Sequence, residues 1–153
     1  MLAAGDIAPV FSLPDVNGTI HTLAEMLQLG PVLAVLYKGA CPVCQLTLPY
    51  LQRISNGGLQ IVAISQDDAS ATSSFASTFG IEFLALLDTQ KSGYAVSKAF
   101  GITNVPSLFL IETDGSISYA GSGFSKTEME ALATRAGMPI FRPNDNVPAW
   151  KPG

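Results

Sequence analysis

The sequence predicts an α/β fold in which a central mixed β-sheet is flanked by helices on both faces. Apolar runs of strand length alternate along the chain with segments that carry helix caps, which is typical of strand–helix–strand units. The run 32–37 is apolar at every position, as expected for a strand covered on both faces. Two later runs, 107–111 and 116–121, flank a Thr-Asp-Gly turn and are expected to pair antiparallel.

The N-terminal segment is expected to contain a hairpin at Asn17-Gly18. This dipeptide favours a type I′ turn, because both central residues of that turn have positive φ. Thr22 and Glu25 have the spacing of a capping box, which predicts a short helix over 23–29. The central strand 32–37 follows directly.

The rest of the chain is expected to alternate between helices and strands. Helices are expected from Cys41 to the Asn-Gly-Gly stop at 56–58 and over 69–79, 92–100 and 125–136. Further strands are expected over 59–65 and 83–87. Pro49 lies inside the first of these helices and predicts a kink.

The chain length favours one domain. A chain of 153 residues suits a single hydrophobic core. We expect that domain to cover 1–137, followed by an irregular tail over 138–153 that contains four of the prolines. No internal repeat and no second domain are visible.

Composition and charge exclude several classes of protein. Apolar residues make up 48% of the chain and charged residues 13%, so a disordered chain and a coiled coil are both excluded. The net charge is −4 and no Lys/Arg cluster exists, which argues against a nucleic-acid partner. No apolar run approaches the roughly 20 residues of a membrane span. The first 20 residues hold no Lys or Arg, so either the protein is cytosolic or a leader has been removed.

The chemistry of the chain is expected at Cys41-Pro-Val-Cys44, between a buried strand and a helix. One helical turn separates the two sulfurs, so they can form and open a disulfide with little backbone movement. Cys41 falls near the helix N-cap, where free N–H groups and the helix dipole favour a thiolate, and Lys38 is expected to add positive potential. Cys41 is therefore the expected nucleophile, and Cys44 the residue that resolves the mixed disulfide.

Other interpretations of two cysteines remain open at this point. They are two inert thiols, a structural disulfide, or half of a zinc site shared across a dimer. The only histidine, His21, lies in the expected hairpin, far from the cysteines in sequence. We therefore expect neither a metal nor another cofactor.

The chain resembles the thioredoxin superfamily and, within it, the TlpA-like thiol–disulfide oxidoreductases; the AhpC/TSA peroxiredoxin-like family is similar as well. The CxxC motif combined with Val105-Pro106 before a strand is more specific than CxxC alone. The matching segments are Gly5-Asp-Ile-Ala-Pro9-Val-Phe11, Leu13-Pro-Asp-Val-Asn-Gly18, Val32 to Tyr37, Cys41-Pro-Val-Cys44 with Pro49, Phe83 to Asp88, Ala99-Phe-Gly-Ile102, Val105 to Ile111 and Asp114-Gly115. The resemblance implies a thioredoxin-like fold with an N-terminal hairpin and a TlpA-like central insertion.

The resemblance also implies a substrate-binding region. Pro106 would be cis and would face Cys41, so that the backbone of Val105 pairs with an extended substrate segment. Pro42 and Val43 would contact the substrate as well. Without the resemblance, an ordinary trans proline that opens a strand is the simpler interpretation.

Three positions depart from the family pattern. Ala40 stands where TlpA-like proteins usually have Trp, and Thr47 stands where they often have Glu. Val35 matches the buried Asp of thioredoxin. The usual proton-transfer groups are therefore missing. Water, Lys38 or a carboxylate, with Asp67 and Asp68 as candidates, would have to serve the leaving Cys44.

The resemblance implies a reductase of protein disulfides, with protein thiols and disulfides as partners. It places the protein in an extracytoplasmic compartment, periplasmic or membrane-tethered, although a cytoplasmic location stays open. Two alternatives are a peroxiredoxin-like peroxidase and a redox-inert binding module. A peroxidase needs Thr or Ser three residues before its cysteine and an Arg nearby, and neither Cys41 nor Cys44 has this arrangement.

Overall fold

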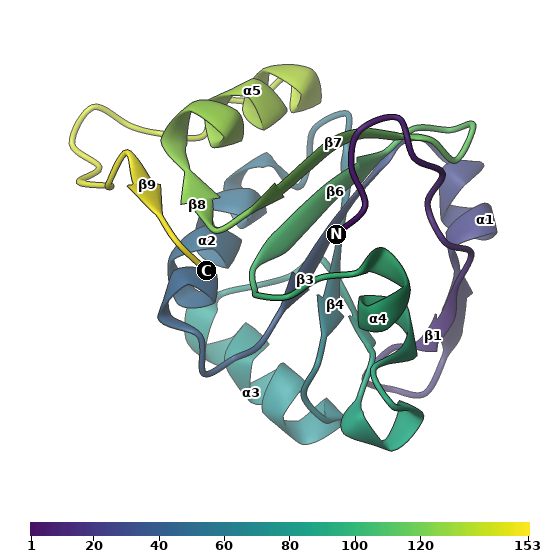
Figure 1. Ribbon diagram of the computed structural model, residues 1–153. Coiled ribbons are helices and arrows are strands. Elements are labelled where there is room, and N and C mark those ends of the chain that lie inside the picture. Colours follow the sequence, from purple (N-terminus) through teal and green to yellow (C-terminus); the bar gives the residue numbers. More distant parts are fainter.

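The computed structural model describes all 153 residues and confirms the mixed central sheet (Figure 1). Its strands are β3 (Val32–Tyr37), β4 (Gln60–Ser65), β5 (Leu84–Leu87), β6 (Ser107–Ile111) and β7 (Ile117–Ser122). They lie in the order β5-β4-β3-β6-β7. β3 is parallel to β4 and antiparallel to β6, so the parallel and antiparallel halves of the sheet meet at its central strand.

Helices cover both faces of the sheet. Successive residues of β3 point to opposite sides, and because all of them are apolar, both faces have to be covered. The helices are α1 (Leu23–Leu27), α2 (Pro42–Ile54), α3 (Ala69–Phe79), α4 (Ala95–Phe100) and α5 (Lys126–Ala136). Leu33 and Val35 belong to the core formed with α2, α3 and α5. Ala34 and Leu36 belong to the core formed with α1 and α4. Every residue of β3 is buried, as its unbroken apolar run predicted.

Side-chain caps place most helix ends where the sequence predicted them. Thr22, Asp68 and Ser125 each accept a hydrogen bond from a backbone N–H three residues later, at the starts of α1, α3 and α5. Gly80 and Gly137 follow α3 and α5 in the left-handed conformation that ends many helices. These boundaries are therefore set by local chemistry.

The N-terminal hairpin is present, but the predicted type I′ turn is wrong. β1 (Ser12–Pro14) pairs antiparallel with β2 (Ile20–Thr22) across a wider loop. Gly18 has a φ of 85°, whereas Asn17 does not have positive φ. The Asp15 carboxylate instead accepts a hydrogen bond from the Asn17 N–H at 2.8 Å and stabilises the wider loop.

The helix predicted over 92–100 is also wrong at its start. A 3₁₀ turn covers Gln90–Ser92, and α4 begins only after Tyr94, whose φ is 51°. The buried carboxylate of Asp88 caps α4 by accepting a hydrogen bond from the Ser97 N–H at 2.7 Å. The cap therefore comes from the end of β5, which local spacing did not indicate.

Two short strands near the end of the sequence were not expected. β8 (Phe124–Ser125) pairs antiparallel with β9 (Trp150–Lys151). Residues 138–149 contain no helix or strand, so β9 is the one regular element within the tail that we expected to be irregular. The division of the chain at residue 137 stays a prediction.

The longest helix, α2, starts directly after the turn that leaves β3. It has 13 residues and contains Pro49. None of the helices combines the length and the hydropathy that crossing a bilayer requires. The start of α2 holds both cysteines: Cys41 is its N-cap residue, and Cys44 lies in its first turn.

Candidate active site

The turn between β3 and α2 places Cys41 at the start of the helix. Cys41 is the N-cap residue of α2, and Pro42 is the first helical residue. The Sγ atom of Cys41 accepts a hydrogen bond from the backbone N–H of Cys44 at 3.2 Å. This donor and the positive end of the helix dipole both favour negative charge on the sulfur.

Cys44 has a different environment. It has no solvent exposure and packs in the core beneath α2, whereas Cys41 is half-buried. Burial raises the pKa of the Cys44 thiol well above its ordinary value, and its hydrogen bond with Cys41 adds to the increase. Cys44 therefore remains a neutral thiol at neutral pH. The two cysteines are chemically unequal, as nucleophilic attack and resolution require.

The segment before β6 approaches the nucleophile from another part of the sheet. β6 is antiparallel to β3 and pairs Ser107 with Leu36, so the residues just before β6 lie beside the turn that follows β3. The Val105–Pro106 bond is cis, as the resemblance implied. The Sγ atom of Cys41 lies 3.5 Å from the carbonyl oxygen of Val105, to which the thiol donates. The sheet register thus explains why residues far apart in sequence meet here.

Two side chains hold the turn before Cys41. The backbone N–H of Gly39 donates to the Asp67 carboxylate at 2.8 Å, and the Gln45 side chain donates to the Gly39 carbonyl at 2.8 Å. Asp67 is one of the two carboxylates that the sequence offered for proton transfer. The other, Asp68, caps α3 instead. Sequence reasoning missed Gln45; its position one turn into the helix from Cys41 was the available signal.

The remaining predicted site residues surround this turn, and Lys38 contacts the Cys44 thiol through its backbone. Lys38 is exposed, and its Nζ atom lies 6.0 Å from the centre of the Tyr94 ring. Pro42 is exposed and Val43 half-buried. Thr47 is fully buried, and its hydroxyl donates to the Val43 carbonyl at 2.7 Å. The Thr47 hydroxyl is therefore already engaged.

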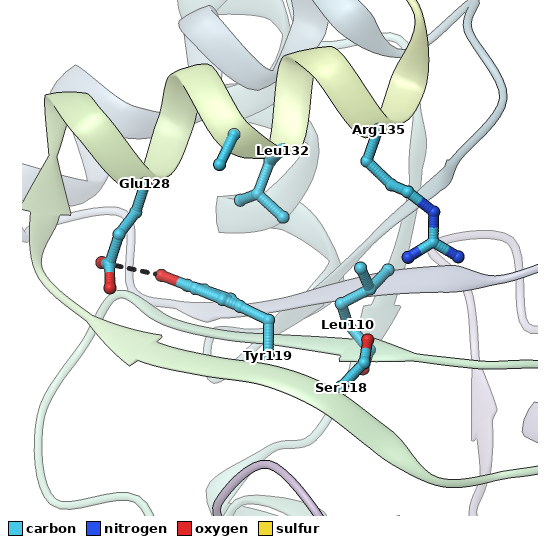
Figure 2. Close-up of a pocket in the computed structure, with 7 residues that line it drawn as sticks. Leu110, Ser118, Tyr119, Glu128, Leu132 and Arg135 are labelled. Carbon is cyan, nitrogen blue, oxygen red and sulfur yellow. Dashed lines mark hydrogen bonds between the residues drawn. The ribbon is translucent and has the colours of Figure 1, made fainter.

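Two hollows differ in their position relative to the nucleophile. A hollow of about 260 Å³ lies beside the active site and is lined by Lys38, Gln66, Ile102, Thr103, Asn104 and Val105. A second, of about 310 Å³, lies between β7 and α5 (Figure 2). In the second hollow the Tyr119 hydroxyl donates to Glu128 at 2.9 Å, and no cysteine lines it. Only the first hollow adjoins the nucleophile.

The groups that would serve a peroxidase or a metal lie elsewhere. Arg53, the nearest arginine in sequence, pairs with Asp145 at 2.6 Å. His21 pairs with Asp15 in the N-terminal hairpin at 2.9 Å. No group of three or more His, Cys, Asp or Glu residues is arranged to hold a metal ion.

The sheet, the CxxC segment at a helix start and the adjacent cis-proline together define a thioredoxin-like protein. The thioredoxin-superfamily resemblance seen in the sequence is thus confirmed. The chain belongs to the Redoxin family, whose model matches residues 3–136.

Relatives of two kinds are similar to this chain. Thiol-disulfide oxidoreductase ResA of Geobacillus thermodenitrificans is 28% identical over 121 residues, which cover 76% of this chain and 67% of that protein. Peroxiredoxin Bcp of Escherichia coli is 31% identical over 140 residues, which cover 80% and 87%. The thioredoxin domain of a thiol-disulfide oxidoreductase from Bacteroides vulgatus matches with a TM-score of 0.77 at 19% identity and covers 89% of this chain and 99% of that one.

Proposed function

We propose that this protein is a thiol–disulfide oxidoreductase that reduces protein disulfides with Cys41 and Cys44. The observation that carries the proposal is the inequality of the two thiols. Cys41 is half-buried at a helix N-terminus and receives a backbone hydrogen bond, whereas Cys44 is buried with a raised pKa. One sulfur is thus suited to attack and the other to wait as a thiol.

The reaction consists of two exchanges. The Cys41 thiolate attacks one sulfur of a substrate disulfide; the substrate S–S bond breaks, the other substrate sulfur leaves as a thiolate, and a mixed disulfide forms. Cys44 then loses its proton to water and attacks the Sγ atom of Cys41. The mixed disulfide breaks, the second substrate sulfur leaves, and a Cys41–Cys44 disulfide forms. Two electrons have passed to the substrate. A dithiol reductant must then reduce the Cys41–Cys44 disulfide before the next turnover.

The surroundings of Cys41 suit an extended protein segment. In this proposal the backbone of Val105 pairs with the substrate, with Pro106, Pro42 and Val43 as further contacts. The 3.5 Å approach of the Val105 oxygen to the sulfur supports that role, because a segment paired with Val105 would lie next to the nucleophile. Lys38 supplies positive charge to the same end of the molecule.

The direction of electron flow and the compartment complete the proposal. We assign the reductant direction and an extracytoplasmic location, periplasmic or membrane-tethered, from the resemblance to TlpA-like proteins. The reduction potential of the Cys41–Cys44 pair is the measurement that tests the direction. Known dithiol proteins range from about −270 to −120 mV, and a value near the oxidising end would contradict a reductase.

Single-cysteine variants test the reaction itself. Cys41→Ser is expected to abolish turnover of a protein disulfide such as that of insulin, because the attacking sulfur is gone. Cys44→Ser is expected to accumulate a mixed disulfide with the substrate, visible by mass spectrometry, because resolution is blocked. Turnover retained by Cys41→Ser would refute the assigned nucleophile. Thiols that never oxidise reversibly would favour a redox-inert binding module instead.

A peroxidase is the second candidate, because the 31% identical relative from Escherichia coli is a peroxiredoxin. The site argues against it. Lys38 and Cys41 occupy the positions three residues before Cys41 and Cys44, where a peroxidase needs Thr or Ser. The nearest arginine in sequence, Arg53, is engaged by Asp145. Rapid oxidation of the reduced protein by hydrogen peroxide, measured by stopped flow, would reverse this ranking.

A further inference from the structure

The last residues of the sequence return to the active site. Beyond β9, Gly153 packs so closely on Val105 that a Cβ atom on Gly153 would lie only 2.9 Å from the carbonyl carbon of Val105. The same Cβ would lie 3.1 Å from the side-chain nitrogen of Asn104. The Val105 oxygen is the one that lies 3.5 Å from the Sγ atom of Cys41. Residues 150–153 therefore reach the backbone that borders the nucleophile.

The sheet brings these residues to that position. β7 pairs Ser122 with Ser107, so the chain leaving β7 passes Pro106, whose carbonyl accepts a hydrogen bond from Gly123 at 2.9 Å. β8 begins at the next residue, and β9 lies antiparallel beside it (Figure 1). A Cβ atom on Gly123 would lie 3.1 Å from the backbone nitrogen of Gly153. β9 thus leads the chain towards the start of β6.

We propose that residues 150–153, here called the strap, occupy the strand-binding surface beside Cys41 and that a protein substrate displaces them. The inference rests on the proposed function, in which an extended substrate segment pairs with the Val105 backbone. Strap and substrate would then compete for the same surface. The strap contains no cysteine, so it can occupy the surface without being reduced or oxidised.

The strap is held weakly, whereas the chain before it is held firmly. β9 pairs with β8 through only two residue pairs, and Trp150 is 59% exposed. Upstream, the Arg53 guanidinium donates to the Ile140 carbonyl at 2.9 Å and to the Asp145 carboxylate at 2.6 Å. The strap can therefore leave the surface while residues 140–145 stay docked on Arg53. These docked residues keep the effective concentration of the strap at the surface high.

Deletion of the strap tests its effect on a protein substrate. We expect a chain lacking 150–153 to reduce a protein disulfide with a kcat/KM about three- to tenfold higher. Apparent affinity for the substrate is proportional to the fraction of molecules whose site is free, and the deletion raises that fraction. A folded deletion variant with unchanged or lower kcat/KM would overturn the proposal. Near-ultraviolet circular dichroism and the Tm report whether the variant is folded.

A pair of substitutions in the full chain gives the same test if the deletion variant does not fold. Gly153→Val adds bulk where the Val105 backbone leaves no room, so it should displace the strap and raise kcat/KM. Lys151→Ala is the matched control, because Lys151 is exposed and its backbone pairing is retained. Equal kcat/KM values for these two variants would also overturn the proposal.

Adding the strap back as a peptide tests the competition directly. A peptide Ala-Trp-Lys-Pro-Gly, corresponding to 149–153, should inhibit the deletion variant, whereas the same peptide ending in Val should not. Absence of Cys41-dependent turnover in every form would instead refute the proposed function, and the strap proposal with it. Turnover that is equal with and without the strap would refute the strap alone.

Discussion

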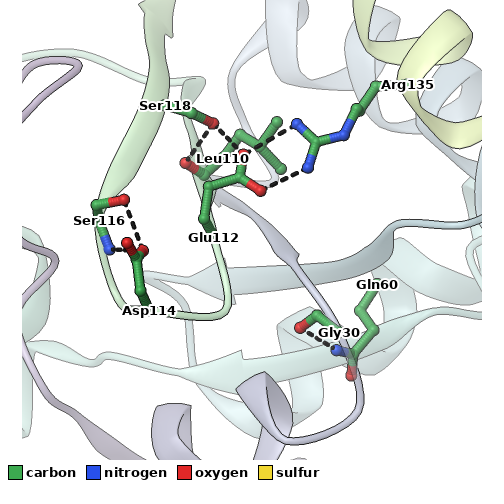
Figure 3. A network of polar contacts seen from close by, with 8 residues as sticks. All are labelled: Gly30, Gln60, Leu110, Glu112, Asp114, Ser116, Ser118 and Arg135. Atoms are coloured by element: carbon green, nitrogen blue, oxygen red, sulfur yellow. Dashed lines mark hydrogen bonds and ion pairs between the residues drawn. The ribbon is translucent and has the colours of Figure 1, made fainter.

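The catalytic end of the molecule and the side between β7 and α5 use polar groups in opposite ways. At the catalytic end, Cys41 forms hydrogen bonds with two backbone groups, the Cys44 N–H and the Val105 carbonyl, and with the neutral Cys44 thiol. On the β7–α5 side, charges neutralise one another: Arg135 pairs with Glu112, which also accepts a hydrogen bond from Ser118 (Figure 3). The difference teaches that the Cys41 sulfur has no charged hydrogen-bond partner, as the proposed reaction requires, whereas the Glu112 carboxylate is already neutralised.

The two regions also differ in the distance along the sequence over which they are assembled. The contact between Cys41 and Val105 joins residues 64 positions apart, and that between Gly39 and Asp67 joins residues 28 apart. On the β7–α5 side, Tyr119 and Glu128 are nine apart, and Glu112 and Arg135 are 23 apart. The catalytic end therefore depends on the sheet register, and substitutions that loosen its long-range contacts should affect activity most.

The largest effect among these contacts is expected at Asp67. Asp67→Ala removes the acceptor that holds the Gly39 N–H, so turnover should fall about ten- to hundredfold, because a hydrogen bond to a charged group contributes about 1.5–3 kcal/mol. The rate of Cys41 alkylation should change with it, since Asp67 acts by positioning the turn.

The neighbouring carboxylate provides the matched control. Asp68→Ala removes the cap of α3 and should cost about 1 kcal/mol of unfolding free energy while turnover stays at the wild-type value. Equal turnover of the two variants would mean that the Gly39 contact has no catalytic consequence.

A second effect, on stability, is expected at alkaline pH and belongs to the catalytic end. The pKa of Cys44 is raised in the folded, reduced protein. The contribution of the protonated Cys44 thiol to the unfolding free energy is therefore fully present below the ordinary thiol pKa and is lost as pH rises above about 8.5. The unfolding free energy should decrease by up to about 1.4 kcal/mol per pH unit in that range.

Denaturant unfolding of the reduced protein between pH 8 and about 9.5 measures this effect below the ordinary tyrosine pKa of about 10. Burial raises the pKa of Tyr37 to about 12, so that residue contributes only at higher pH. The Cys44→Ala variant should lack the Cys44 contribution. A variant with the same pH dependence as wild type would contradict the assignment.

The smallest effect is expected on the β7–α5 side. Arg135→Ala should cost at most about 1 kcal/mol of unfolding free energy, because exposed ion pairs contribute little, and turnover should not change. The Arg135 guanidinium lowers the pKa of Glu112, so the stabilisation is present at neutral pH and is lost as pH falls below about 4.3. Acid unfolding of wild type and variant checks this, and a loss of turnover would contradict the contrast between the two regions.

Local signals in the sequence located most elements because their causes are local. The unbroken apolar run gave β3 its bounds, and the caps at Asp68 and Ser125 gave α3 and α5 theirs. Predictions failed where a distant group decided the conformation. Asp88 at the end of β5 caps α4, so Ser92 does not begin that helix.

The candidate site divides in the same way. The placement of Cys41 at the N-cap of α2 followed from its strand–turn–helix context, and the approach of Val105 was expected only through a family resemblance. Gln45 and the engaged hydroxyl of Thr47 were not identified, because a helical spacing does not show which face is covered. The strap was not identified either, since a strand of two residues carries no periodicity.

The sequence by itself determined the fold class, the central strand and the position of both cysteines, because apolar periodicity and helix caps act between residues a few positions apart. The tertiary structure alone decided which cysteine is buried, which carboxylate holds the turn before Cys41, and that Gly153 lies against Val105. Burial and long-range contact depend on how the strands pair. The antiparallel pairing of β6 with β3 brings Val105 to Cys41, and the parallel pairing of β4 with β3 brings Asp67 to Gly39.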